Sequence, residues 1–231
     1  MKRIFMLLIL LILIGCSEEK ATEVVDVPVI GEEEEEEQVE LPQTISIPIV
    51  STNDSLTISL SNIPLLAYYL GNADSNVEEL TKNFKATHLI DLENSSLYVM
   101  GYACQNNDCS YLFIQKGEEE RIIPVADIAS FVSFQMSPDQ EKILLHFART
   151  KTDETKKNHI SVIDLENMEI LPLKNEELTV DILNYHYVIE SMEWVDEDKV
   201  QVQLATNPKE TEIQLEESEN QSQQNTFVFE L

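Results

Sequence analysis

The side chains that could carry out chemistry are three cysteines, four histidines and a large excess of carboxylates. No residues fall into H-E-x-x-H, H-x-H, G-x-S-x-G, P-loop or G-x-G-x-x-G spacing, so the motifs of zinc enzymes, hydrolases and nucleotide-binding proteins are missing. Acid pairs such as Asp196 and Asp198 are expected by number alone among 43 Asp and Glu residues, and solvated turns explain them. We therefore predict no catalytic residue, no metal site and no cofactor. The histidines are His88, His146, His159 and His186.

Two of the cysteines, Cys104 and Cys109, bracket a short polar segment between two β-prone runs. In a four-residue hairpin loop the flanking residues face each other at a distance that a disulfide can bridge. Closing so small a loop stabilises the fold by only about 2 kcal/mol. A redox site is disfavoured because the pair lacks C-x-x-C spacing and a basic neighbour. The sequence thus predicts a structural disulfide, with a reduced pair as the alternative. The enclosed Asn106-Asn107-Asp108 has too few oxygen ligands to hold Ca²⁺ alone.

The third cysteine, Cys16, follows a short basic and apolar segment at the N-terminus. Lys2 and Arg3 precede a run from Ile4 to Ile14 without one polar residue, which is typical of a signal peptide. The run is shorter than the ~20 residues that a membrane-spanning helix needs. A plain secretory signal and an uncleaved membrane helix are the alternatives.

The sequence Leu13-Ile14-Gly15-Cys16 resembles the lipobox of bacterial lipoproteins. The resemblance implies that residues 1–15 are removed, that Cys16 receives diacylglycerol, and that a further acyl chain such as palmitate is added. Since each buried CH₂ contributes about 0.8 kcal/mol, two or three acyl chains anchor a protein stably where one does not. The resemblance therefore implies a lipid-anchored protein on the extracytoplasmic face of the cell membrane.

Residues 16–42 have the composition of a solvated linker. Between residues 17 and 42, eleven carboxylates accompany Lys20 as the one cation, and Glu32 to Glu37 are consecutive. Like charges repel and nothing apolar interrupts the glutamate run, so we expect an extended, disordered tether. The alternative is a loose site for divalent cations or for a basic partner.

From residue 43 to 231 the pattern is that of one antiparallel β domain. Residues 200–204 alternate apolar and polar side chains, as a half-buried strand does. His146 is expected in or at the rim of a strand, and residues 76–84 as a single short helix capped by Asp74 or Ser75. We also expect the last strand, 226–231, to pair with the first, 44–50, and so to hide two sheet edges. Further strands are predicted at 55–60, 97–103, 111–115, 143–147 and 160–163.

A weak repeat marks three strand–turn–strand units. Residues 136–144 and 194–200 align when Ile143 is matched with Val200, and residues 92–97 form a weaker copy ending at Leu97. The segment from Phe134 to Asp139 resembles part of a blade of TolB-like and WD40-like propellers. The resemblance extends over residues 89–231 and implies a partial or small propeller. The resemblance departs from the family at Gln140 and Glu197, where a glycine usually follows the Asp. A β-sandwich or meander is the alternative.

The net charge of −28 disfavours nucleic acid and anionic surfaces. Together with the missing catalytic motifs, it favours a non-enzymatic binding module, with an envelope protein that has a basic surface as partner. The alternative is a surface hydrolase whose carboxylates meet only in the fold.

Overall fold

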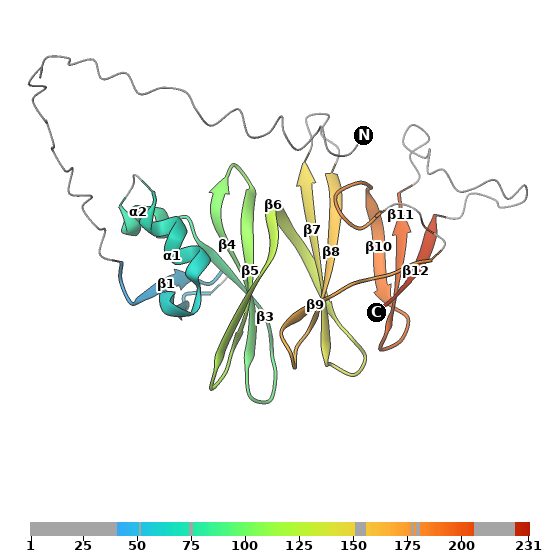
Figure 1. The fold of residues 1–231 in the computed structure, drawn as a ribbon, viewed down its shortest axis with the longest axis horizontal. Coiled ribbons are helices and arrows are strands. Elements are labelled where there is room, and N and C mark those ends of the chain that lie inside the picture. The colour runs from blue at the N-terminus through green and yellow to red at the C-terminus, as the bar shows by residue number, and fades with distance from the viewer. Residues whose placement is uncertain are drawn as a thin grey trace, which may run out of the picture. The chain divides into compact units, whose positions relative to one another are not determined.

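The computed structural model describes residues 41–50, 52–73, 76–150, 156–176, 178, 181–205 and 225–231. Cys16, the predicted signal peptide, the glutamate run and the predicted caps Asp74 and Ser75 lie outside these residues. The described part is mainly antiparallel β, which confirms the predicted fold class (Figure 1). Its strands form a two-stranded, a seven-stranded and a three-stranded sheet.

The described part of the chain contains twelve strands and three short helical elements. The strands are β1 (Thr44–Pro48), β2 (Ser55–Ser59), β3 (Lys85–Asp91), β4 (Ser96–Gln105), β5 (Asp108–Lys116), β6 (Glu120–Met136), β7 (Lys142–Thr150), β8 (Lys156–Asp164), β9 (Glu169–Leu171), β10 (Ile189–Trp194), β11 (Lys199–Leu204) and β12 (Thr226–Glu230). The helices are a 3₁₀ turn (Leu60–Asn62), α1 (Pro64–Gly71) and α2 (Val77–Thr81). All the strands expected from the sequence are present.

The expectation of one short helix is wrong, because two α-helices precede β3. The predicted helix is α2, and its N-cap is Asn76, whose side chain accepts a hydrogen bond from the Glu78 amide at 2.8 Å. The unexpected helix is α1, which begins with Pro64 at its first turn, where the missing N–H costs nothing. Its sequence is apolar on every face, so it lacks the periodicity by which a helix is recognised.

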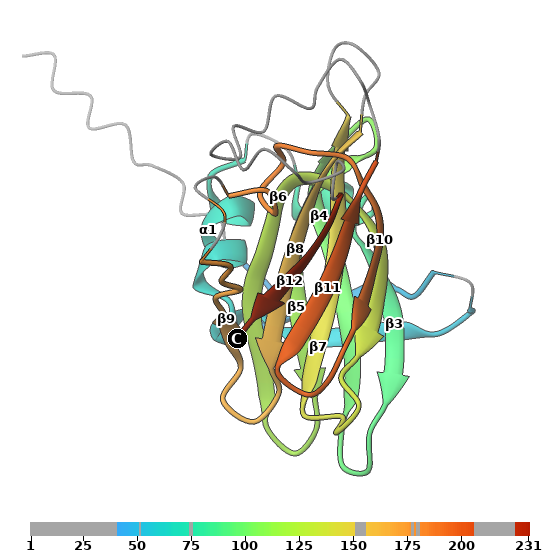
Figure 2. The ribbon, with the colours of Figure 1, turned by 90° about the vertical axis from the view of Figure 1, so that its right-hand side faces the viewer.

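The long strand β6 belongs to both halves of the seven-stranded sheet. Its residues up to Ala129 pair with β5, and those from Ser130 pair with β7. The register breaks at Asp127 and Ile128, and Ile128 has a φ of 46°. At this bend the chain changes direction (Figures 1 and 2). The seven strands therefore form two groups, β3 to the first half of β6 and the second half of β6 to β9.

The repeat seen in the sequence corresponds to equivalent hairpins. The second residue of β4 is Leu97, that of β7 is Ile143 and that of β11 is Val200, and all three are fully buried. Gln140 has a φ of 62°, a conformation that glycine adopts freely, which explains why a glycine would suit that turn. Aligning Ile143 with Val200 thus matched residues with the same structural role.

Three apolar layers hold the sheets together. The first joins β1, β2 and α1 to β3–β5, the second lies between the two halves of the seven-stranded sheet, and the third joins β7 and β8 to β10–β12. Side chains cross the third junction: the Gln135 amide donates to the Met192 carbonyl at 2.8 Å, and the Trp194 indole N–H approaches the Gln135 carbonyl at 3.4 Å.

The expected pairing of the first and last strands is wrong. β1 pairs with β2, and the Val50 amide donates to Ala86 of β3 at 2.7 Å. β12 lies between β11 and residue Lys174, whose backbone exchanges two hydrogen bonds with Glu230 at 2.8 Å. The described residues between 44 and 83 form a hairpin and helices, and the described residues close no ring. The likeness to propeller blades stays a prediction.

Candidate functional site

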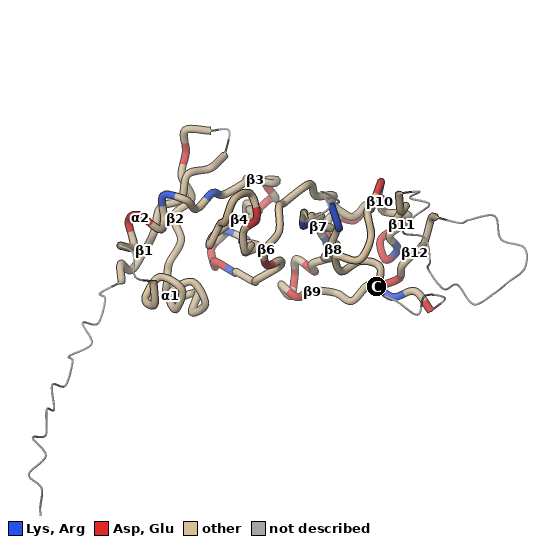
Figure 3. The backbone as a smooth tube through the Cα atoms, turned by 90° about the horizontal axis from the view of Figure 1, so that it is seen from above, with Lys and Arg blue, Asp and Glu red and all other residues tan. Residues whose placement is uncertain are grey.

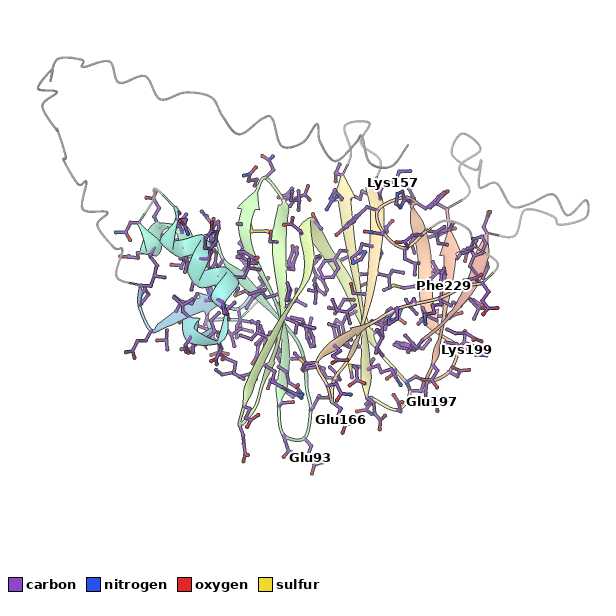
Figure 4. All side chains as sticks on the ribbon, in the orientation of Figure 1. Glu93, Lys157, Glu166, Glu197, Lys199 and Phe229 are labelled. Carbon is purple, nitrogen blue, oxygen red and sulfur yellow. A yellow bond between two sulfur atoms is a disulfide. The ribbon has the colours of Figure 1, made fainter. Side chains whose placement is uncertain are left out.

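Five turns at one end of the strands form a surface that we call the acidic rim. They connect β3 to β4, β5 to β6, β6 to β7, β8 to β9 and β10 to β11. Glu93, Glu166 and Glu197 mark three of them along the lower edge of Figure 4. The exposed carboxylates of the rim are Glu93, Glu118, Glu119, Asp139, Glu141, Glu166, Glu197 and Asp198.

Direct contacts make the five turns one continuous surface. A Cβ atom on Gly117 would lie 2.9 Å from the Asn94 carbonyl, so the turns at 92–95 and 117–119 touch. The Arg121 guanidinium donates to the carbonyls of Leu165 and Glu166 and joins the first group of strands to the second. Lys142 contacts Asp198 at 3.3 Å and joins the second group to the three-stranded sheet.

The cations of the rim are used internally. Lys142 is held between Asp139 at 3.5 Å and Asp198 at 3.3 Å. Burial acts to lower the pKa of Lys142, but these two carboxylates outweigh it and the pKa lies above its ordinary value. The Arg121 guanidinium donates to the backbone carbonyls of Leu165 and Glu166. Asp139 and Asp198 share Lys142, whereas the six exposed glutamates of the rim have no ion pair among the described residues, so the rim projects negative charge.

Local hydrogen bonds keep rim carboxylates ionised. The Ser137 hydroxyl and the Glu141 amide both donate to Asp139, and the hydroxyl is the larger cause of its lowered pKa. The Asn167 amide lowers the pKa of Asp164 in the same way. Asp196 accepts from the Asp198 amide at 2.9 Å, which repeats the geometry of Asp139.

The opposite ends of the strands carry a different surface, which we call the bend rim. It comprises the tip of the β4–β5 hairpin, the β6 bend and the facing ends of β7 and β8. The predicted disulfide is present at the hairpin tip, with Cys104 and Cys109 joined at a Cα–Cα distance of 4.0 Å. The loop is tighter than expected, because Gln105 pairs with Asp108 and leaves a two-residue turn with Asn106 at a φ of 58°.

The β6 bend is held by one arginine. Arg149 of β7 donates to the Ile128 carbonyl at 2.8 Å and to the Asp127 carbonyl at 2.6 Å. Its guanidinium carbon also lies 4.0 Å from the ring centre of Tyr185, a cation–π contact. Ile128 is 59% exposed and β-branched, so its left-handed conformation is strained. The arginine satisfies the carbonyls that the bend leaves unpaired.

Aromatic side chains stack below the bend. Tyr185 lies on the His159 ring with centroids 5.0 Å apart. Burial raises the pKa of the Tyr185 hydroxyl to about 12, although Arg149 acts against it. That hydroxyl has no hydrogen-bond partner among the described residues. His159 interacts with the Leu183 carbonyl at 3.1 Å and the Ser161 hydroxyl at 2.9 Å, and burial lowers its pKa.

His146 lies in β7 but is buried rather than at a rim. Its Nε2 lies 2.6 Å from the Asn158 amide nitrogen, and the Asn158 oxygen accepts from the Ile189 backbone at 2.7 Å. Burial, with the nearby His159 as the smaller cause, lowers the pKa of His146 to about 4. With these lowered pKa values, His146 and His159 are neutral at pH 7 and have a structural role. The position of His146 in its strand did not predict its burial.

One shallow pocket of about 270 Å³ lies beside β12. Among the described residues that line it, Asp181 is the one carboxylate and none is a histidine. Its lining is Leu173, Lys174, Asn175, Leu178, Asp181, Ile182, Leu183 and Phe229. The described lining therefore brings no second carboxylate beside Asp181.

The described residues include no group of three or more His, Cys, Asp or Glu side chains that could hold a metal ion. Nor do they include a helix long and apolar enough to cross a membrane.

The sequence identified the acidic turns and the disulfide but not Arg149, Ile128 or Asn158. A β-branched residue in a bend and a polar residue in a buried strand carry no local signal. Comparison of the chain with protein-family models, with curated proteins and with solved structures gave no match.

Proposed function

We propose that the protein is a lipid-anchored lipoprotein of the extracytoplasmic face of the membrane that acts as a non-enzymatic binding module. Cys16 is the attachment site for diacylglycerol, and the acidic segment after it is the tether. The acidic rim is the recognition surface, and its partner is a protein with a basic surface.

One observation carries this proposal: turns from all three groups of strands bring their carboxylates to one continuous surface, while Lys142 and Arg121 are turned to internal bonds. Such a surface favours cationic partners by electrostatic steering and rejects anionic ones. Rigid strands hold the turns in place, which lowers the entropy lost on binding.

A basic probe of defined chemistry tests the recognition surface. We expect neutralising the rim to weaken binding of a lysine homopolymer by about tenfold or more at low salt, because several charges are removed from one surface. The rim variant combines Glu93→Gln, Glu118→Gln, Glu119→Gln, Glu166→Gln and Glu197→Gln. Binding is measured by fluorescence anisotropy over a range of salt concentrations.

A control variant of equal net charge separates surface from total charge. It carries Asp54→Asn, Glu78→Gln, Glu79→Gln, Glu176→Gln and Glu190→Gln, all of which lie outside the rim. We expect the control to bind the probe almost as the unaltered protein does. Equal weakening in both variants would contradict recognition by the rim.

The anchor has its own test. We expect Cys16→Ser to leave the protein unprocessed or released from the membrane, because the acyl chains are its one strong membrane contact. Cell fractionation with immunoblotting measures this. A mutant still processed and still in the membrane pellet would refute the anchor without touching the acidic rim.

A further inference from the structure

The outward face of α1 is apolar and uncharged in a chain of net charge −28. Leu65 is 48% exposed and Tyr68, one turn later on the same face, is 70% exposed. Their neighbours Leu66 and Leu70 are buried on the opposite face. A surface helix normally exposes polar side chains to water. The exposed face of α1 is unusual because its side chains are apolar.

The absence of charge extends beyond the helix. From Ser55 to Ala73 the sequence contains no Asp, Glu, Lys or Arg, and Figure 3 draws α1 without a charged residue. Glu120 approaches this region by accepting from the Asn62 side chain at 3.2 Å, but it is paired with Lys116. The α1 face is therefore electrically neutral as well as apolar.

The chain enters the folded part beside this helix. Leu41, the first described residue, packs against the same apolar layer as α1, and its side chain would lie 3.8 Å from a Cβ atom on Gly71. The Gln43 carbonyl accepts from the Leu60 amide at 3.0 Å, just before α1. The α1 face thus lies at the root of the segment that leads back to Cys16.

We propose that this face, centred on Leu65 and Tyr68, contacts the boundary between headgroups and acyl chains of the bilayer that holds the anchor. This inference rests on the proposed lipid anchor. Tyrosine suits that boundary because its ring is apolar and its hydroxyl is polar. The contact is apolar rather than electrostatic, so the negative charge of the chain does not drive it.

The length of the intervening chain makes a weak contact sufficient. Residues 17–40 separate Cys16 from Leu41, and a flexible chain of that length spans roughly 25–30 Å, or more when its charges extend it. A tether of this kind holds the face at an effective concentration near the millimolar range. An apolar patch too small to bind free protein to membranes can then engage the bilayer.

A single tryptophan placed on the face tests the contact. The variant Trp194→Phe with Tyr68→Trp is anchored in phosphatidylcholine vesicles that carry a quencher on their acyl chains. The matched control is Trp194→Phe with Val195→Trp, because Val195 is 53% exposed and belongs to the acidic rim. We expect quenching and a shift of the emission to shorter wavelength at position 68, unchanged by salt, and neither effect at position 195.

Equal emission from the two variants on anchored vesicles would overturn the proposal. Protein that lacks its acyl chains is coupled through the Cys16 thiol to a maleimide lipid, since the other two cysteines form a disulfide. The α1 face is thereby tested even if the proposed acylation fails, and failure of acylation is seen separately as vesicles without protein before coupling.

Discussion

The acidic rim and the bend rim, at the two ends of the same strands, differ in how their polar groups are hydrogen bonded. At the acidic rim, turn carboxylates accept bonds from nearby backbone amides, as when Asp139 accepts from Glu141 and Asp196 from Asp198, two residues away. At the bend rim they join distant segments, as when Arg149 reaches back to the carbonyls of Asp127 and Ile128. The local bonds lie at the exposed surface, whereas the long-range bonds of Asn158, beneath the bend rim, are buried.

The difference separates recognition from stability. A turn that satisfies itself can change its outward side chains at little cost, which suits a binding surface. A buried polar network costs the desolvation of every group left unpaired when one member is removed. Substitutions that remove a hydrogen-bonding side chain at the bend rim or just beneath it are therefore expected to lower stability, and those at the acidic rim to alter binding.

The largest effect is expected at Asn158, beneath the bend rim. Asn158→Leu leaves both the Ile189 amide and the His146 ring nitrogen buried without a partner, so we expect a loss of about 3 kcal/mol in the free energy of unfolding. Urea titration measures it. The same change at Asn167, which is exposed on the acidic rim, is the control and is expected to cost less than about 0.5 kcal/mol. Similar losses at the two positions would remove the contrast.

A pH effect of intermediate size is expected at His146. Its pKa of about 4 in the folded protein lies below the 6.5 of the unfolded chain, so the unfolded state binds the proton first. Stability from this residue is intact above pH 6.5 and falls as the pH drops toward 4, by about 2 kcal/mol at pH 5.

The matched variant for this test is His146→Gln, which keeps a hydrogen-bond acceptor without the titration. Urea titrations of both proteins at pH 7 and pH 5 isolate the contribution, because the carboxylates titrate alike in each. Parallel losses of stability would show that His146 is not the group involved.

A smaller effect of opposite sign is expected at the bend. Ile128→Gly removes the strain of a β-branched residue at a φ of 46° and should stabilise the protein by about 1 kcal/mol. Arg149→Met removes the bonds to the bend but keeps a side chain over Tyr185. A double-mutant cycle of thermal unfolding then reports whether arginine and bend are coupled. Strict additivity would mean that Arg149 does not hold the bend.

The smallest effect on stability is expected from the rim variant with five Glu→Gln changes. Each change should alter the free energy of unfolding by less than about 0.5 kcal/mol, since exposed surface charges contribute little. A loss of several kcal/mol on urea titration would show that the acidic rim, too, is structural.

Much of this division could be anticipated from the sequence. The strands, the equivalent positions Leu97, Ile143 and Val200, and the disulfide follow from alternation, turn residues and cysteine spacing. Local patterns report local structure, and each turn of the acidic rim is a local structure. The glutamates of its turns were therefore visible as acidic turns before their mutual contacts were known.

The remainder depends on contacts that no local pattern encodes. α1 was missed because an apolar run without periodicity does not distinguish a helix from a strand. The pairing of β12 beside Lys174 depends on a segment more than fifty residues earlier in the chain. Arg149 and Asn158 acquire their roles through residues on other strands, so their importance is visible only in three dimensions.

The bend in β6 also determines how mechanical load passes through the protein. The first half of β6 pairs with β5 and its second half pairs with β7. The two groups of strands therefore cannot separate without breaking backbone hydrogen bonds or straightening the bend. A force applied at Leu41 and resisted at the turns of the second group of strands would have to strip a β ladder or straighten the corner at Ile128. The three-stranded sheet shares no strand with its neighbour, so under load it is expected to detach before the two groups joined by β6 separate.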